Sequence, residues 1–484
     1  MVAPVGVLMA LLLRAGASID QGSPGVSVVF GVPRLIGSED YRSGPNSSRF
    51  WFPSISIATG IPGHVAQHVT LSGDDGTSGG CPAAGHPGQS CEQVMLTQDG
   101  GHTYTVVKRV ANGTSGTFNG YGDLGTHVPG GNLPAGTFRA IVACNECPAG
   151  TGGSVGRPAF LQTWVELGTV ATTAAATATT TATGGTLRLA NNQTVAFVGT
   201  PAAFSGSATC AVHGSYGQSC GLNGPSPTIL RLRDGSLLAA FYGLAADAPT
   251  TCSAARCRTI ALYHSTDALR WTYLSRIDQT PAMGTDGIGP SESSMAELEG
   301  GRVLLVFRQG VGTPLHQTYS HDGGRTWLPP APTTAWAVWP QLLRLSNGAL
   351  VLTAGRPGIG LWVSPGADGV DWVHHDVELE HNARAPAEFA FSNSSCGPHF
   401  LLPPWRCYPK PRPPGSVWSD TSSYTGVAEV APGVMLLAYD RIAQNATRKG
   451  NVGLAALQQI FTMQVTVAAP GPNARTTTAR STQS

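Results

Sequence analysis

A hairpin pattern recurs along the second half of the chain. Each copy consists of a short apolar strand, a turn that closes on a glycine, and a second apolar strand. The turn glycines are Gly235, Gly301, Gly348 and Gly433, and a more eroded copy surrounds Gly60. A hairpin that returns every ~45–85 residues predicts an array of similar antiparallel sheets rather than one continuous sheet.

A second hairpin lies between these copies. In HQTYSHDGGRTWLPP the spacing from Ser320 to Trp327 is Ser-x-Asp-x-Gly-x-Thr-Trp. Asp and Gly favour a tight turn, and the aromatic residue can fold back beneath it. Residues 97–104 keep the full spacing with Tyr in place of Trp, and residues 265–271 and 364–372 are looser copies. Two alternating hairpins describe a four-stranded propeller blade with variable loops.

The fold predicted from these repeats is all-β, a six-bladed β-propeller over residues 19–467. Only 12% of the 484 residues are charged, and 62 Gly and 36 Pro supply many turns, which favours short strands over long helices. A pair of β-sandwiches is the competing architecture, because sandwiches also have regularly spaced strands. The Ala/Thr-rich stretch 170–186 is an inter-blade loop or a simple strand, and residues 468–484 are expected to be a disordered tail.

The N-terminus and the cysteines indicate secretion. The apolar run from Val5 to Leu13, followed by Ala15-x-Ala17, predicts a signal peptide over residues 1–18. Five Asn-x-Ser/Thr sequons point the same way, at Asn46, Asn112, Asn192, Asn393 and Asn445. We therefore expect the protein to be secreted or to lie in the lumen of the secretory pathway.

Ten cysteines form five local pairs: Cys81/Cys91, Cys144/Cys147, Cys210/Cys220, Cys252/Cys257 and Cys396/Cys407. Short separations fit disulfides that staple loops in an oxidising compartment. Metal binding at Cys144 and Cys147 is the alternative, but no second CxxC accompanies them. A net charge of +1 gives no reason to expect a nucleic-acid partner, and no later apolar run is long enough to span a bilayer.

The glycine hairpins also predict which residues meet. Nine residues before each turn glycine lie Trp51, Ser226, Glu292, Trp339 and Tyr424. If the blades are equivalent, these residues occupy one position on each innermost strand, at one end of the central axis. A purely structural position would carry similar apolar residues, whereas this set includes an acid and a phenol. Such variety is typical of a site assembled around a propeller axis.

Two arginines end the second strands of their hairpins, Arg308 and Arg356. Guanidinium groups bind a carboxylate through bidentate, charge-assisted hydrogen bonds. A glutamate beside a tyrosine can take its proton and make the phenolate a nucleophile. Considered singly, each arginine is expected to form a surface or inter-blade salt bridge. Glu292 alone would cap a strand, and Tyr424 alone would be a packing residue. Their coincidence at equivalent positions favours a site.

At these residues the chain resembles the sialidase (neuraminidase) superfamily of six-bladed propellers, over roughly residues 45–465. Ser320 to Trp327 resembles the Asp box of that family, which is a structural hairpin. The stretches GPSESSMAELEGGRVLLVFR, GRPGIGLWVS and SSYTGVAEV resemble the family segments that carry the base, an arginine and the nucleophile. The resemblance implies Tyr424 as nucleophile, Glu292 as its base, and Arg308 and Arg356 as two of three arginines that grip a substrate carboxylate.

The same resemblance implies a general acid, for which Asp74 and Asp75 are the candidates and Asp75 is preferred. A turn aspartate is the structural alternative. The first family arginine is missing, because Trp51 takes its place in FWFPSI. Arg49 lies two residues earlier, on the same strand face, and can substitute for it. Arg34 is a less well placed candidate.

The expected activity is therefore that of an exo-α-sialidase, a retaining glycoside hydrolase that removes a terminal acidic sugar from sialylated or other acidic glycans. Two alternatives remain: a propeller of the same family that acts on another sugar, with Trp51 as a stacking platform, and a non-catalytic carbohydrate-binding propeller. No cofactor or metal is expected, since the histidines of HHDVELEH (374–381) define no ligand set.

Overall fold

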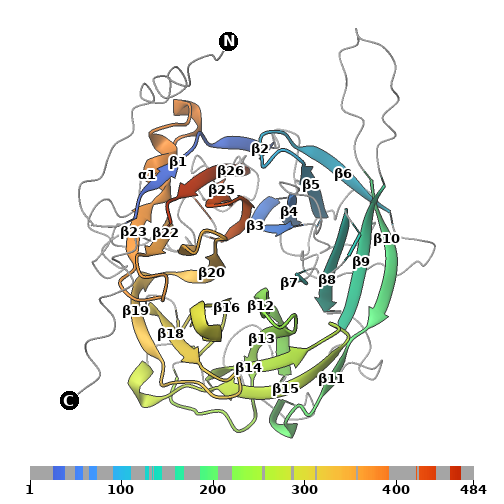
Figure 1. Ribbon diagram of the computed structural model, residues 1–484, viewed down its shortest axis with the longest axis vertical. Helices are drawn as coiled ribbons and strands as arrows, with labels where there is room; N and C mark the ends of the chain where they lie inside the picture. Colours follow the sequence, from blue (N-terminus) through green and yellow to red (C-terminus); the bar gives the residue numbers. More distant parts are fainter. Residues whose placement is uncertain are drawn as a thin grey trace, which may run out of the picture.

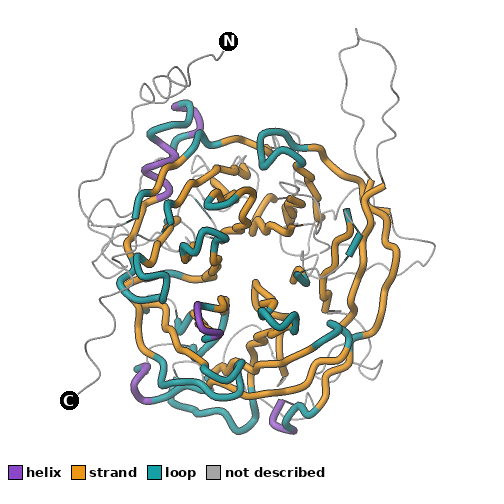
Figure 2. The backbone as a smooth tube through the Cα atoms, viewed as in Figure 1, coloured by secondary structure: helices purple, strands orange, loops and turns teal. Residues whose placement is uncertain are grey.

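The described residues of the computed structural model form a ring of antiparallel sheets around a central axis (Figure 1). Strands dominate the ring, and the helical segments are short (Figure 2). The described residues are 26–38, 49–57, 65–72, 91–110, 126–129, 133–134, 136–143, 159–167, 186–204, 221–252, 257–284, 288–310, 313–355, 358–391, 421, 424–442 and 458–469. The predicted signal peptide and all but the first two residues of the predicted tail lie outside them.

The strands pair into five sheets, which together establish the predicted all-β propeller. The first sheet contains β1 (Val28–Phe30), β2 (Arg34–Ser38), β24 (Thr425–Ala431), β25 (Val434–Ile442) and β26 (Gln458–Val467). The second contains β3 (Arg49–Ile57), β4 (Val65–Ser72), β5 (Cys91–Thr97), β6 (Thr105–Val110), β7 (Thr126–His127), β8 (Thr137–Ala143), β9 (Ala159–Leu167) and β10 (Thr186–Thr194).

The other three sheets follow in chain order. The third contains β11 (Ala196–Val198), β12 (Gly221–Arg231), β13 (Leu237–Leu244), β14 (Arg258–Ser265) and β15 (Arg270–Ile277). The fourth contains β16 (Ser293–Glu297), β17 (Val303–Phe307), β18 (Pro314–Ser320) and β19 (Ala331–Trp336). The fifth contains β20 (Val338–Arg344), β21 (Leu350–Gly355), β22 (Ile359–Ser364) and β23 (Val373–Asp376).

The helical segments of the described chain are all shorter than two turns. They are η3 (Ala202–Phe204), η4 (Pro281–Met283), η5 (Glu299–Gly301), α1 (Val377–Asn382) and η6 (Ala387–Phe389). The cluster HHDVELEH thus spans the end of β23 and most of α1. In α1, His381 is fully buried, and its ring nitrogens bond the Tyr439 hydroxyl and the Phe389 carbonyl.

The sheet count differs from the six blades predicted. The eight-stranded sheet consists of two consecutive runs of four strands, β3–β6 and β7–β10. These runs are joined because β6 and β10 pair in parallel, from Thr186 opposite Lys108 to Arg188 opposite Val110. Among the described strands, β16 contacts β12 and β20, β20 contacts β24, and β24 contacts β3. The first strands of the units therefore follow one another around the axis (Figure 1).

The ends of the chain close the ring. Strand β26 lies between β25 and the N-terminal strands β1 and β2, and it pairs antiparallel with all three. Residues more than 400 positions apart, such as Val28 and Val467, thereby share one sheet. This pairing joins the two ends of the described chain in one sheet and so closes the ring.

The glycine hairpins form as predicted. Gly235, Gly301, Gly348 and Gly433 all have positive φ, between 74° and 89°, and each lies in the turn between two antiparallel strands. At Gly433 a side chain would also collide, because a Cβ there would lie 2.5 Å from Asn347 Nδ2. Glycine is required at these turns because other residues rarely adopt this backbone conformation. Gly60 lies outside the described residues.

The Ser320–Trp327 hairpin is structural, as predicted. Asp322 Oδ1 accepts hydrogen bonds from the backbone N–H groups of Arg325 and Thr326, and Oδ2 accepts one from Thr326 Oγ1 at 2.6 Å. The indole of Trp327 donates to Ser275 on the neighbouring sheet. The hairpin around Asp99 repeats this carboxylate pattern with His102 and Thr103. These turns therefore order the loops and tie neighbouring sheets together.

The core consists of buried side chains from neighbouring sheets that pack against one another. Every residue of β17, β21 and β22 is buried. A strand covered on both faces reads as a continuous apolar run instead of an alternating one, which explains sequences such as VLLVF. One cluster joins the third and fourth sheets and another joins the fourth and fifth. These clusters pack the third, fourth and fifth sheets against one another.

Candidate active site

The site is built on the β16–β17 hairpin, which continues for one residue pair beyond its assigned strands. The Arg308 N–H donates to the Glu292 carbonyl at 2.8 Å, and the Ser291 N–H donates to the Arg308 carbonyl at 3.0 Å. This register places Glu292 and Arg308 opposite one another. Their side chains are 6% and 9% exposed, and Arg308 Nη1 lies 2.9 Å from Glu292 Oε1. The hairpin therefore presents a buried ion pair.

Tyr424 reaches the same carboxylate from a different sheet. It immediately precedes β24, and its hydroxyl donates to Glu292 Oε1 at 2.9 Å. From β20, the Trp339 N–H donates to Glu292 Oε2 at 3.1 Å. The Trp339 and Tyr424 rings are stacked, with centroids 4.5 Å apart and planes 6° from parallel. Three sheets thus contribute to one cluster.

The electrostatics of the cluster keep Arg308 charged. Burial by itself would lower the Arg308 pKa, but the nearby charge of Glu292 and the Tyr424 phenol outweigh it, so the pKa lies above its ordinary value. The Arg308 Nε group is also satisfied, because it donates to the Gly310 carbonyl at 3.2 Å. Arg308 is therefore first of all the counter-ion of Glu292.

This arrangement can transfer a proton. A phenol hydroxyl 2.9 Å from a carboxylate oxygen is within reach for direct transfer, and a guanidinium beside both groups stabilises negative charge on either. A phenol and a carboxylate in this arrangement are suited to support nucleophilic attack by a tyrosine oxygen.

The repeat register correctly places Glu292, Trp339 and Tyr424 together, and Arg308 joins them. Arg49 and Trp51 lie on β3, opposite Ser72 and Thr70 of β4, but their side chains lie outside the described part of the structure. Arg356, Asp74 and Asp75 also fall outside the described residues, so the roles predicted for these five residues remain predictions.

Arg34 does not join the cluster. Its guanidinium donates to the His102 carbonyl at 2.8 Å, in the Asp99 hairpin, so it helps to close the ring instead. The sequence patterns predict no role for Trp339. A signal was present, because Trp339 is one of the five residues that the register places at the axis and Pro340 follows it.

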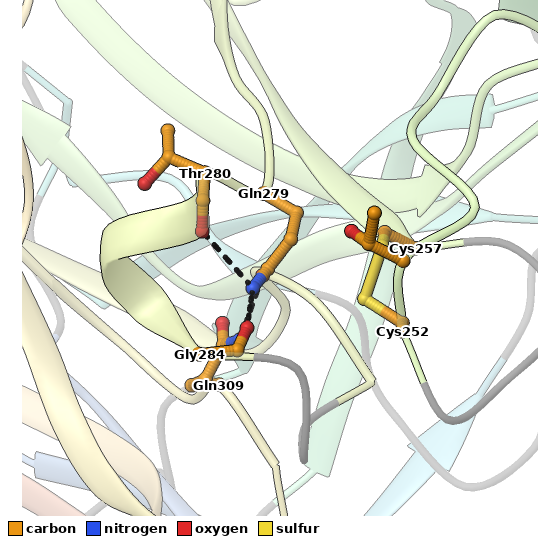
Figure 3. The surroundings of a disulfide bond; sticks show 7 residues. Cys252, Cys257, Gln279, Thr280, Gly284 and Gln309 are labelled. Atoms are coloured by element: carbon orange, nitrogen blue, oxygen red, sulfur yellow. Dashed lines mark hydrogen bonds between the residues drawn. A yellow bond between two sulfur atoms is a disulfide. The ribbon is translucent and has the colours of Figure 1, made fainter.

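A buried polar layer supports the strand end behind Arg308. The amide of Gln309, which is 1% exposed, donates to Gln279 Oε1 at 2.6 Å. Gln279 in turn donates to the carbonyls of Gly284 and Thr280 (Figure 3). The Cys252–Cys257 disulfide lies beside this layer and confirms that predicted pair (Figure 3). The other four predicted pairs involve residues whose side chains are not described.

Backbone hydrogen bonds connect the disulfide loop to the site. The Arg258 N–H, next to Cys257, donates to the Ile288 carbonyl at 2.8 Å, and the Ile288 N–H donates to the Gln309 carbonyl at 2.9 Å. Gly289 has a φ of 88°, and a Cβ there would lie 2.5 Å from the Arg258 nitrogen. The segment that leads into Glu292 is therefore tightly packed against this loop.

Within the described residues, no group of three or more His, Cys, Asp and Glu side chains could hold a metal ion. The same part of the chain contains no helix that is long and apolar enough to cross a membrane.

Comparisons with known proteins find likeness in structure but not in sequence. No family model and no curated protein matches the chain. Among solved structures, the chain is similar to a Dyadobacter fermentans protein of unknown function, with 14% identity, a TM-score of 0.47, and coverage of 92% of this chain and 100% of that one.

Two of the similar structures are glycoside hydrolases. A Trypanosoma rangeli sialidase in complex with sialic acid has 12% identity and a TM-score of 0.48, over 91% of this chain and 59% of the sialidase. A GH93 α-L-arabinofuranosidase of Fusarium graminearum in complex with arabinobiose has 12% identity and a TM-score of 0.48, over 90% and 97% of the two chains. At these values the likeness concerns the arrangement of strands and says nothing about the reaction of this chain.

Proposed function

We propose that this protein is a retaining exo-glycosidase of sialidase type, which removes a terminal acidic sugar such as sialic acid from glycoconjugates. The observation that carries the proposal is the Tyr424 hydroxyl, which donates at 2.9 Å to a Glu292 carboxylate buried against Arg308. A phenol, a base and a permanent cation in one cluster are the components of an activated tyrosine nucleophile.

In the first step, Glu292 Oε1 takes the phenol proton while the Tyr424 oxygen attacks the anomeric carbon. The bond to the leaving group breaks, and a general acid, which we assign to Asp75, protonates the departing oxygen. Water then gives a proton to the Asp75 carboxylate and attacks the glycosyl-tyrosine from the same side as the original leaving group. Tyr424 departs and regains its proton from Glu292, so two inversions give net retention.

A tyrosine suits a substrate whose anomeric carbon carries a carboxylate. An anionic Asp or Glu nucleophile would be repelled by that charge, whereas a neutral phenol is not. Arg356 and Arg49 are proposed to bind the substrate carboxylate together with the donors of Arg308 that Glu292 and Gly310 do not occupy.

A second candidate is a glycosidase of the same fold that acts on a neutral sugar. It is favoured by the pairing of Arg308, whose Nη1 and Nε groups already bond within the protein. It is also favoured by Trp51, which takes the position of the first arginine in the sialidase family that this chain resembles. An indole there could stack on an apolar sugar face. Turnover of neutral glycosides but not of sialosides would select this candidate.

The test is release of a fluorophore from an α-sialoside by the wild type and by Tyr424→Phe. We expect the variant to lose turnover by about 10³-fold or more, because it keeps the ring but not the nucleophilic oxygen. Tyr319→Phe is the matched control, since the Tyr319 hydroxyl donates to the Asp368 carbonyl instead and should be dispensable. A 2,3-difluorosialic acid should label the tryptic peptide that contains Tyr424, detected by mass spectrometry. Full activity of Tyr424→Phe would refute the proposal.

Two wider features belong to the same proposal. The two four-strand runs of the eight-stranded sheet are proposed to act as separate blades, which makes six with the other four sheets. The leader, the sequons and the cysteine pairs support action in an oxidising, secretory compartment; the exposed position of Asn192 on β10 is compatible with glycosylation there.

A further inference from the structure

The backbone of Trp339 is in an unfavourable conformation. Its φ is +53°, a value that residues other than glycine, asparagine and aspartate rarely adopt. The next residue is Pro340, and a residue before proline is normally pushed into an extended conformation with negative φ. Trp339 is therefore strained for two independent reasons.

The strain coincides with an irregularity in strand pairing. Between β20 and β21 the register shifts in the interval from Val338 to Gln341, and Trp339 lies in that interval. Such bulges re-aim a side chain and are common beside active sites. Strain of this kind persists where the surrounding structure enforces it, and it clusters at functional sites.

The unusual backbone gives Trp339 two contacts at once. Its N–H, turned toward the axis, donates to Glu292 Oε2 at 3.1 Å. Its indole lies flat on the Tyr424 ring, with a centroid distance of 4.5 Å. Trp339 thus holds both members of the proton-transfer pair from a third sheet.

We propose that Trp339 is a positioning residue that aligns the phenol of Tyr424 with the carboxylate of Glu292. The Trp339 N–H holds Oε2, and Arg308 Nη1 and the phenol hydroxyl both donate to Oε1, so Oε1 is the oxygen placed to receive the phenol proton. The indole face restricts rotation of the phenol ring, which keeps its hydroxyl on Oε1 and directs its oxygen along one line of attack. This inference rests on the proposed function, because it assigns Trp339 a part in the same reaction.

The alternative is that Trp339 is only a packing residue. The two accounts predict different kcat values for Trp339→Gly, in which the backbone strain is relieved under either account because glycine adopts positive φ without strain. If the indole only fills space, its loss lowers stability and leaves kcat unchanged. If it positions Tyr424, glycine relieves the backbone strain while catalysis suffers.

The experiment compares Trp339→Gly, Trp339→Phe and Tyr424→Phe by steady-state kinetics on a fluorogenic α-sialoside or, if that is not turned over, on the neutral glycoside that is. For Trp339→Gly we expect kcat to fall about 10–100-fold, as misplacement of a reacting group by about 1 Å does, with KM changed less than threefold. Trp339→Phe keeps an aromatic face and the N–H, so its kcat should return to within about fivefold of the wild type.

A second measurement does not depend on turnover. With 3-fluorotyrosine at position 424, the ¹⁹F spectrum of the wild type and of Trp339→Phe should show one narrow resonance. In Trp339→Gly that resonance should broaden or split as the ring gains freedom. An unchanged resonance in Trp339→Gly overturns the inference, as does a kcat within twofold of wild type while Tyr424→Phe is inactive. Activity in Tyr424→Phe would refute the proposed function instead, and the ¹⁹F result would still decide the role of Trp339.

Discussion

The ion pair between Arg308 and Glu292 gives the sharpest test of how the site is held together. Its two side chains are 9% and 6% exposed, and they come from opposite strands of one hairpin. Removing one partner leaves the other charge buried without a counter-ion, which typically costs 3–5 kcal/mol. We expect the lower end for Arg308→Met, about 3 kcal/mol, because the Tyr424 hydroxyl and the Trp339 N–H still donate to the carboxylate.

Glu292→Gln should lose a similar amount, about 3 kcal/mol, because it leaves Arg308 charged and buried. The double variant has neither charge. It should therefore lose about 3 kcal/mol in total rather than the roughly 6 kcal/mol of two independent effects, which corresponds to a coupling of about 3 kcal/mol.

The assay is equilibrium unfolding in urea at pH 7, followed by tryptophan fluorescence, with the slope of each transition compared across the cycle. Arg276→Met is the control, because Arg276 pairs with Asp247 and Asp278, whose side chains are 57% and 28% exposed, and it should lose about 1 kcal/mol or less. If the losses of the two single variants add to within about 0.5 kcal/mol in the double variant, Arg308 is not the counter-ion of Glu292 and the electrostatic account of the site fails.

Three further outcomes follow from the structure. Replacing both Cys252 and Cys257 by serine should lower the unfolding free energy by about 2 kcal/mol, because the unfolded chain is then no longer constrained by a closed short loop. In urea titrations a reductant should destabilise this variant less than the wild type. Hydrogen bonds from Thr326 hold the Asp322 pKa at about 2, so the carboxylate stabilises the fold above about pH 4 and this stabilisation is lost toward pH 2. The Tm of Asp322→Asn should therefore depend less on pH between pH 4 and pH 2, and an unchanged slope would contradict this. Burial lowers the His381 pKa to about 4, so the protein loses stability as the pH falls from 6.5 toward 4. The stability of His381→Gln should therefore depend less on pH between pH 7 and pH 5, measured by unfolding followed by circular dichroism.

The hairpins were predictable because their signals are local. Gly348 and Gly433 close turns whose flanking strands are apolar runs, and Asp322 organises a turn through side chains within four residues of it. The unit that contains β7 and β8 was missed, since residues 126–143 carry neither of the two hairpin patterns in recognisable form. The parallel pairing of β6 with β10 was also missed, because no local signal specifies contact between strands about 80 residues apart.

The site was predictable as far as the repeat register reaches. Counting nine residues back from a turn glycine places Glu292 and Tyr424 at equivalent positions, and the structure joins them by a hydrogen bond. The register cannot specify side-chain partners. It predicted Arg308 for a substrate carboxylate, a role that stays a prediction, but it did not show that Arg308 also pairs with Glu292. It also could not show the strained backbone of Trp339, because that conformation depends on a bulge between two strands.

The pairing of Arg308 has a consequence for the charge of the substrate. Arg308 and Glu292 cancel one another, and Tyr424 is neutral before reaction, so this cluster carries no net charge. An acidic sugar brings one negative charge into it, and binding that charge in a partly buried site requires cations beyond the one already paired. On the proposed function, we therefore expect Arg356 and Arg49 to decide between acidic and neutral sugars and the Glu292–Tyr424 pair to perform the same chemistry on either. Arg356→Met should accordingly raise KM for a sialoside much more than it lowers kcat, because it removes binding that the ground state and the transition state share.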